Sequence, residues 1–229
     1  MTKANKSLSE RAYTLLRRDI IEGTFRPAQP LRLASLQTRY DIGFSPLREA
    51  LTRLSAEGLV VAESMRGFRV APLSLDDLRD TMETRIFVET EALRRSIARG
   101  DDDWEARIVS TLYAFGRQLK RSVPDDPESA EALEDRHRDF HVALVSASGS
   151  KRLEQIIEHL YLASARYRML QPAKNRALPI RDLEREHGDI ADAAIERDID
   201  TAVRLLTAHY EATAAILEAA HMSRFEAAG

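Results

Sequence analysis

Apolar positions in the first third of the chain recur with a helical period. Residues 7–21 carry apolar side chains three and four positions apart with Arg and Asp between them, which predicts an amphipathic helix. One Gly and two Pro then break the pattern, and a short second helix is expected from Leu33 to about Asp41. A tight turn precedes a third helix, for which Ser45 is the expected N-cap and Pro46 the first helical residue.

The third helix has one apolar stripe, formed at positions i, i+3, i+4 and i+7 by Leu47, Ala50, Leu51 and Leu54. Gly58 is expected to end this helix. Residues 59–64 and 68–72 are short β-rich runs on either side of a turn and predict a hairpin. A helix-turn-helix followed by a hairpin is the winged-helix arrangement. In it, the helix after the turn enters the major groove of DNA, and the wing lies along the adjacent backbone.

The expected DNA contacts lie in the wing and on the face of the third helix opposite its apolar stripe. Arg48 stands in the first turn of that helix, the end that points at base edges, and its guanidinium suits guanine or a phosphate. The full set of expected contacts is Ser45, Arg48, Thr52, Arg53, Arg66 and Gly67. Each Arg taken alone could equally be a solvated side chain. Their coincidence with this motif favours DNA binding.

Beyond residue 73 the pattern is helical throughout. Helices are expected over residues 75–100, 101–122, 128–148, 151–170, 178–197 and 199–222, with a linker around residues 123–129. Short loops join most of these helices, which predicts an antiparallel six-helix bundle. The expected fold class is therefore mainly α, with a winged-helix domain at residues 1–73 and a helical domain at residues 74–229.

Charge separates the same two parts. Residues 1–73 carry 12 Lys and Arg against 7 Asp and Glu, whereas residues 74–229 carry 22 against 30, so the first part is a candidate for binding a polyanion. The chain has no Cys, which excludes disulfides, thiol chemistry and Cys-based zinc sites. Neither a signal-peptide pattern nor a long apolar run is present, so no membrane association is expected and the cytoplasm is the expected compartment.

Three of the six His residues lie on different predicted helices: His141, His187 and His209. Imidazole is a good ligand for Zn, Ni, Mn or Fe(II), so convergence of the three would form a metal site with open positions. The alternative is that each is a surface residue or a hydrogen-bonded core residue. His137 lies four residues before His141 and therefore on the same face of its helix.

Two Glu-x-x-His pairs, Glu134/His137 and Glu184/His187, offer a different function, that of a helical-bundle metalloenzyme. They are half of a ferritin-like di-metal carboxylate site, which needs a Glu from each of two further helices. This alternative leaves two of the three candidate His without a role and the basic winged helix unexplained. Hydrolase motifs such as HExxH and Gly-x-Ser-x-Gly do not occur in the sequence. We therefore do not expect an enzyme.

Longer stretches resemble a known family. The run LRLASLQTRYDIGFSPLREALTRLSAEGLVV, followed by GFRVAPLS, resembles the winged-helix domain of the GntR family of bacterial transcription regulators, with PLREAL as the recognition-helix signature. The runs RHRDFHVALVSASGS, EREHGDIADAAIERD and LTAHYEAT resemble the FCD ligand-binding domain of the FadR subfamily. Within that subfamily, the pattern is most similar to the CsiR branch of glutarate regulators. Phe44 and Ala34 are departures, because many members have Arg at both positions.

The resemblance implies a metal site. In metal-binding FCD domains one Asp and three His hold a divalent metal, and the three His correspond to His141, His187 and His209. Where the family has the Asp, this chain has His137, which is expected either as a fourth ligand or as a hydrogen-bond donor to the effector. The candidate metals are Zn, Ni and Mn.

Two Arg residues are candidates for binding a carboxylate effector. Many FCD domains have an Arg that reaches into the pocket at the position of Arg85, and a guanidinium binds a carboxylate bidentately. The alternative partner of Arg85 is Glu89, in an i,i+4 salt bridge on the helix surface. Arg166 is a weaker candidate for a second carboxylate. The resemblance thus implies a homodimeric repressor that binds a palindromic operator in double-stranded DNA and responds to a small carboxylate.

Overall fold

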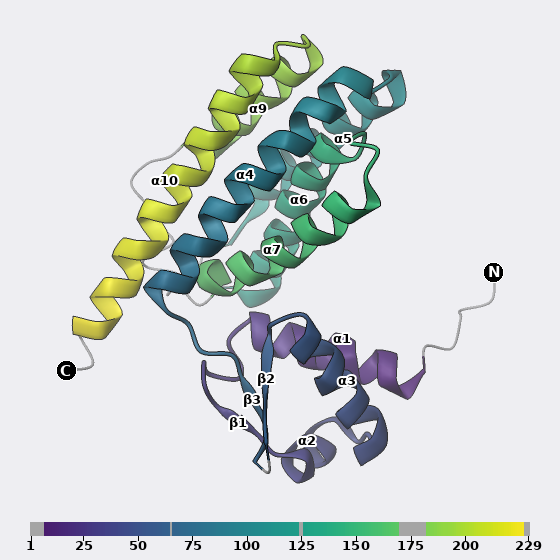
Figure 1. Ribbon diagram of the computed structural model, residues 1–229, viewed down its shortest axis with the longest axis vertical. Helices are drawn as coiled ribbons and strands as arrows, with labels where there is room; N and C mark the ends of the chain where they lie inside the picture. The colour runs from purple at the N-terminus through teal and green to yellow at the C-terminus, as the bar shows by residue number, and fades with distance from the viewer. Residues whose placement is uncertain (1–6, 65, 124–125, 170–181, 227–229) are drawn as a thin grey trace. The chain divides into compact units, whose positions relative to one another are not determined.

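A computed structural model describes residues 7–64, 66–123, 126–169 and 182–226. These residues fall into two compact units: one runs to Ser74 and includes residues 165–169 of a later helix, and the other begins at Leu75. Figure 1 shows that the first unit mixes helices with a small sheet and that the second is helical. No helix within these ranges is long and apolar enough to cross a membrane.

The N-terminal unit has three helices: α1 (Leu8–Ile21), α2 (Leu33–Tyr40) and α3 (Phe44–Ala56). The hydroxyl of Ser7 caps α1 by accepting a hydrogen bond from the backbone N–H of Glu10. The predicted order of helix, helix, turn and helix is therefore confirmed.

The start of α3 differs from the prediction. Gly43, and not Ser45, is the N-cap residue, so Phe44 is the first helical residue and Ser45 lies inside the first turn. Gly43 has extended backbone (ψ 164°), which lets the chain enter the helix earlier than a Ser cap would. Pro46 is still accommodated, because the first backbone N–H groups of a helix have no intrahelical partner.

A three-stranded antiparallel sheet completes this unit, with β1 (Pro30–Leu31), β2 (Val60–Glu63) and β3 (Gly67–Val70) in the order β1-β3-β2. Strands β2 and β3 form the predicted hairpin, in which Ala62 lies opposite Phe68. The sequence pattern does not predict β1, because two residues are too few to show an alternation of apolar and polar positions.

The core of this unit lies between α1, α3 and the sheet. Its buried side chains include Leu16, Ile20, Leu47, Leu51, Leu54, Val60 and Val70. The whole predicted apolar stripe of α3 is buried. Because that stripe faces the core, the opposite face of α3 is left to solvent.

The second unit contains, among its described residues, the helices α4 (Leu75–Arg99), α5 (Asp102–Arg121), α6 (Pro127–Val145), α9 (Leu183–Ile195) and α10 (Ile199–Glu226). It also contains the part of α7 (Lys151–Met169) that runs to Ser164. Helix α5 packs against α6 and α9, and α4 packs against α10 and α6. The long neighbours α4 and α10 lie side by side in Figure 1. This arrangement is the predicted helical bundle.

Two helix starts differ from the prediction. Helix α6 begins at Pro127, inside the predicted linker, because Pro is readily accepted at the first helical position. Helix α9 begins at Leu183, where the side chain of Asp182 accepts a hydrogen bond from the backbone N–H of Arg185. The predicted helical residues 170 and 178–181 lie outside the described ranges.

The middle of the bundle is polar. Its buried polar side chains include Arg85, Glu89, His141, Ser164, His187, His209 and Tyr210. Aromatic rings border them: the ring centroids of Phe115 and Phe140 lie 4.7 and 5.3 Å from that of His187. Polar groups taken out of water cost free energy unless they are hydrogen-bonded. This region is therefore where a functional site is expected.

Candidate metal centre and nucleic-acid interface

Four His side chains converge in the middle of the bundle. His137 and His141 lie on α6, His187 on α9 and His209 on α10. One candidate ligand nitrogen from each ring lies within 4.8 Å of those of the other three. His137 is partly buried and the others are buried. The structure thus brings together the three predicted ligands and the candidate fourth, which we call the four-His cluster.

The outward nitrogens of two rings are held by acceptors. Nδ1 of His187 lies 2.7 Å from the carbonyl oxygen of Leu183, and Nδ1 of His209 lies 3.2 Å from a carboxylate oxygen of Glu186. Both oxygens can only accept, so each Nδ1 carries the proton and donates. The lone pair of each neutral ring is therefore on Nε2, the form in which imidazole binds a metal.

His141 is oriented by a tyrosine. Its Nδ1 lies 3.0 Å from the hydroxyl oxygen of Tyr210, and that hydroxyl donates its own proton to Glu89. The tyrosine oxygen therefore accepts from Nδ1–H of His141, which again leaves the lone pair on Nε2. Burial, followed by the charges that the other three His and Arg85 would carry, lowers the pKa of His141 well below its usual range. His141 is thus held neutral, as a metal ligand must be.

His137 has a similar arrangement. Its Nδ1 lies 3.3 Å from the hydroxyl oxygen of Tyr161, whose proton is donated to the carboxylate of Glu134 at 2.7 Å. Its Nε2 lies 3.1 Å from Nε2 of His141. Two imidazole lone pairs at this distance repel each other unless a cation or a shared proton lies between them. The donor set therefore fits a divalent metal that accepts nitrogen ligands, such as Zn or Ni.

Arg85 is connected to the four-His cluster through Tyr210. Only 1% of its side chain is exposed, and its guanidinium donates to Glu89 at 2.7 Å, to the hydroxyl of Ser164 at 2.8 Å and to the hydroxyl of Tyr210 at 3.2 Å. The predicted i,i+4 pair with Glu89 is thus formed, but in the core and not on the helix surface. Arg85 is linked to His141 through Tyr210, so its shown contacts are those of a supporting residue.

Arg166 is not brought to the four-His cluster by the contacts that the structure shows. It is buried, and its guanidinium donates to the backbone carbonyl of Ala71. Arg166 lies in the segment 165–169, which belongs to the N-terminal unit. The expected contact between Arg166 and an effector stays a prediction.

The Glu-x-x-His pairs do not form a di-metal site. Glu184 is half exposed and pairs with Lys120 on α5 at 2.7 Å. Glu134 accepts a hydrogen bond from the hydroxyl of Tyr161, and the oxygen of that hydroxyl lies next to Nδ1 of His137. Glu134 is therefore connected to His137 through Tyr161. Within the described parts of the chain, the group of side chains placed to hold a metal consists of His alone.

Sequence reasoning missed the residues that orient the imidazoles. Glu89, Tyr161, Glu186 and Tyr210 each contact a ligand or the partner of a ligand. Two of them have a local signal, since Tyr210 directly follows His209 and Glu186 directly precedes His187. The others lie on different helices or turns, so they come together only in the folded bundle.

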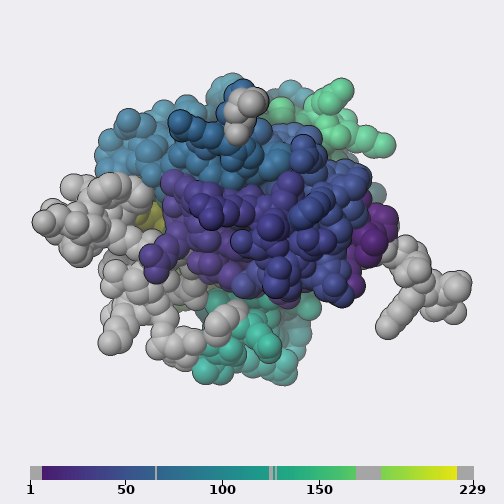
Figure 2. All heavy atoms as spheres, turned by 90° about the horizontal axis from the view of Figure 1, so that it is seen from below, coloured from purple at the N-terminus to yellow at the C-terminus, as the bar shows by residue number. Residues whose placement is uncertain are grey.

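The predicted DNA contacts lie on the exposed face of α3 and on the wing. Ser45, Arg48 and Thr52 are exposed at positions i, i+3 and i+7, and so lie on one side of the helix. Arg66, in the turn between β2 and β3, and Gly67, the first residue of β3, are exposed. Figure 2 looks onto the end of this unit that carries α2 and the β2–β3 turn. No ion pair holds Arg48 or Arg66 in the described structure, and both guanidinium groups reach solvent.

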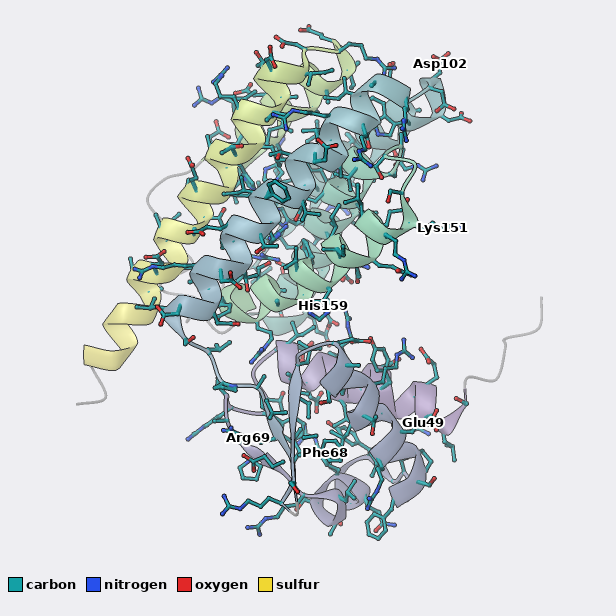
Figure 3. All side chains as sticks on the ribbon, in the orientation of Figure 1. Glu49, Phe68, Arg69, Asp102, Lys151 and His159 are labelled. Carbon is teal, nitrogen blue, oxygen red and sulfur yellow. The ribbon has the colours of Figure 1, made fainter. Side chains whose placement is uncertain are left out.

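The neighbouring side of α3 is tied to α1. Glu49, labelled in Figure 3, accepts a hydrogen bond from the hydroxyl of Ser9 at 2.6 Å. Arg53 donates to Glu10 at 2.9 Å and lies over the ring of Tyr13, 3.6 Å from its centroid. These contacts give Arg53 a structural role, while 51% of its side chain stays exposed and its expected DNA contact stays a prediction.

Comparisons with known proteins match both units of the chain to known families. Residues 8–70 match the family described as bacterial regulatory proteins, gntR family, and residues 80–212 match the FCD domain. The HTH-type transcriptional regulator BphR of Paraburkholderia xenovorans is 39% identical over 212 residues, which cover 93% of this chain and 86% of that protein. The HTH-type transcriptional repressor GlaR of Escherichia coli is 34% identical over 200 residues, with coverages of 86% and 90%.

Solved structures share the fold. A GntR transcriptional regulator from Rhodococcus sp. RHA1 superposes with a TM-score of 0.75 at 23% identity, covering 94% of this chain and 99% of that chain. McbR/YncC of E. coli superposes with a TM-score of 0.73 at 19% identity, with coverages of 93% and 97%.

Proposed function

Because the chain belongs to the gntR family of bacterial regulatory proteins and carries an FCD domain, we propose that it is a ligand-responsive transcription repressor. Its family and its relatives are transcriptional regulators and not enzymes. In the proposal, residues 1–73 bind a palindromic operator, and residues 74–229 bind the effector and pair two copies into a homodimer. A small carboxylate shifts the equilibrium between two domain arrangements, only one of which matches the spacing of the half-sites.

The exposed face of α3 carries the DNA-binding part of the proposal. It exposes the side chains of Ser45, Arg48 and Thr52 to solvent. The neighbouring side of α3 is hydrogen-bonded to α1 through Glu49 and Arg53. Arg48 lies near the N-terminal end of the helix, where side chains reach base edges in a helix-turn-helix. We propose Arg48 as a base-edge or phosphate contact, and Arg66 with Gly67 as backbone contacts of the wing.

Replacing Arg48 with Ala is expected to weaken specific operator binding by about 1–3 kcal/mol, since it removes a guanidinium contact. The measurement is fluorescence anisotropy at fixed salt, with an operator selected from a random-sequence pool. Arg107→Ala, an exposed Arg on α5, is the matched control and should leave the affinity unchanged. Arg66→Ala should weaken binding to all sequences alike and flatten its salt dependence. Unchanged operator affinity in Arg48→Ala would show that α3 does not read DNA.

The four-His cluster carries the sensing part of the proposal. His137, His141, His187 and His209 would hold Zn, Ni or Mn, with His137 as the fourth ligand. When bound, the metal supplies a positive charge to which a carboxylate oxygen can coordinate. The chain's own part is to fix the imidazoles in the correct orientation and to keep bulk water out. Arg85 supports this arrangement through Tyr210.

The effector is proposed to be a C2 to C6 mono- or dicarboxylate, with glutarate as the first candidate on the resemblance to the CsiR branch. Saturating effector should stabilise the folded protein by about 2–3 kcal/mol, which corresponds to a rise in Tm of roughly 5–10 °C. A thermal-shift screen of these acids, with Ni²⁺ or Zn²⁺ and with a chelator, tests this. The rise should require metal, and the same acid should release the operator. If no acid shifts Tm in either condition, the sensing part of the proposal is wrong.

A further inference from the structure

Phe44 is an exposed aromatic residue at the first position of α3. Gly43 is the N-cap residue, so the chain is already helical at Phe44. Phe44 is 49% exposed, whereas the members of the apolar stripe of α3 that faces the core are at most 1% exposed. The partly buried apolar side chains that pack against this core come from other described residues: Tyr13, Leu15, Leu33 and Phe68. The core of the unit is thus filled without Phe44.

Phe44 lies on the face of α3 that is proposed to enter the major groove. Residues four apart are neighbours on one face of a helix, so Phe44, Arg48 and Thr52 form one row along α3, and all three are exposed. Glu49 and Arg53, which are hydrogen-bonded to α1, are not part of this row. A recognition helix contacts base edges with its N-terminal residues. Phe44 is therefore placed in the groove one turn ahead of Arg48.

The chemistry of a phenyl ring selects one base. In the major groove, guanine, cytosine and adenine present hydrogen-bond donors and acceptors, with which a phenyl ring cannot pair. Thymine also presents its C5-methyl group, an apolar surface that a Phe side chain can contact. Such a contact removes apolar surface of both groups from water, which is favourable. A polar base edge at the same place would lose water and gain no partner from the ring.

We propose that Phe44 reads a thymine in each half-site of the operator through the C5-methyl group of that base. This inference rests on the DNA-binding part of the proposed function and adds the base that is recognised. Phe44 determines specificity in this role, because it discriminates among bases and makes no contact with a phosphate. Its loss should therefore weaken binding to the operator and leave binding to unrelated duplex DNA unchanged.

Deoxyuridine isolates the methyl group, because it pairs with adenine as thymidine does and lacks only the C5-methyl. The full-length protein is titrated with an operator selected from a random-sequence pool, and with copies in which single thymines are replaced by uracil. Fluorescence anisotropy at fixed salt gives the Kd of each complex. At one thymine in each half-site, the replacement should weaken binding by about fourfold, the effect of one methyl group returned to water.

Phe44→Ala should bind the thymine and uracil versions of that position equally, because the alanine side chain is too short to reach the methyl group. Phe44→Gln is a second variant with a good helix-forming residue. It should also lose the uracil effect, and selection with it should change the preferred base at that position to adenine, which an amide pairs bidentately.

Leu8→Ala is the matched control. Leu8 is the first residue of α1 and is 55% exposed, so this variant also removes an exposed apolar side chain from the first position of a helix. Because Leu8 does not lie on α3, the variant should keep the full uracil effect of the wild type.

The outcomes separate this inference from the proposed function. Equal affinity of the wild type for the thymine and uracil versions at every position would overturn the role of Phe44 and leave DNA binding standing. A uracil effect of the same size in Phe44→Ala or Phe44→Gln would also overturn it, because another residue would then contact the methyl group. If the selection yields no operator, the DNA-binding function fails and the role of Phe44 fails with it.

Discussion

Arg85→Ala is expected to lower the free energy of unfolding by about 3–5 kcal/mol, because it leaves the charge of Glu89 buried and unbalanced. The Arg85 and Glu89 side chains are each only 1% exposed. The same substitution removes the donor to Ser164 and the cation that lies over the ring of Tyr210, 4.5 Å from its centroid. Urea denaturation followed by far-UV circular dichroism measures the change.

A second ion pair on the same helix provides the control. Arg95 and Glu91 also form an i,i+4 pair at 2.8 Å, but both side chains are 43% exposed. Exposed pairs contribute about 0–1 kcal/mol, so Arg95→Ala should cost less than about 1 kcal/mol. The cost of Arg85→Ala should also be largely recovered in the double variant Arg85→Met/Glu89→Leu, which removes both charges. Equal losses in Arg85→Ala and Arg95→Ala would rule out the unbalanced charge as the cause.

The N-terminal unit could be predicted in detail because its signals are local. The stripe at positions 47, 50, 51 and 54 gives both the helix and its buried face, and Gly58 follows the end of that helix. The first residue of α3 could not be predicted, since Gly43 and Ser45 are both acceptable N-cap residues and Pro46 fits a helix that begins after either of them. The role of Arg53 could not be predicted, because its partner Glu10 is 43 residues away in the sequence.

The candidate site depends on contacts between helices, which periodicity does not determine. The spacing within one helix places His137 beside His141, but it does not say that His187 and His209 face the same point. The resemblance to a family supplied that expectation. The pair Arg85–Glu89 is visible in the sequence as an i,i+4 spacing, yet its burial follows from the packing of α4 against α10 and α6. A charged pair on a helix is ordinarily expected on the surface.

Removal of one imidazole should separate metal ligands from ordinary core His. His141→Ala is expected to weaken Ni²⁺ binding by roughly a hundredfold or more, because losing a ligand should cost at least as much as losing an outer-shell partner. Tyr210→Phe keeps the imidazole and removes the hydroxyl that accepts from its Nδ1, accepts from Arg85 and donates to Glu89. That variant should weaken binding by roughly ten- to a hundredfold. His159→Ala, at an exposed position, should have no effect.

The affinities are measured by competition with a chromophoric chelator, and metal content by elemental analysis after dialysis. Far-UV circular dichroism and operator binding show whether each variant is folded, so that a loss of metal affinity is not confused with unfolding. The affinity for Ni²⁺ should decrease from the wild type to Tyr210→Phe and from Tyr210→Phe to His141→Ala, because the tyrosine orients the ring and the ring itself binds the metal. A folded His141→Ala protein with wild-type affinity for Ni²⁺ would mean that the four imidazoles meet for the stability of the bundle and not for a metal.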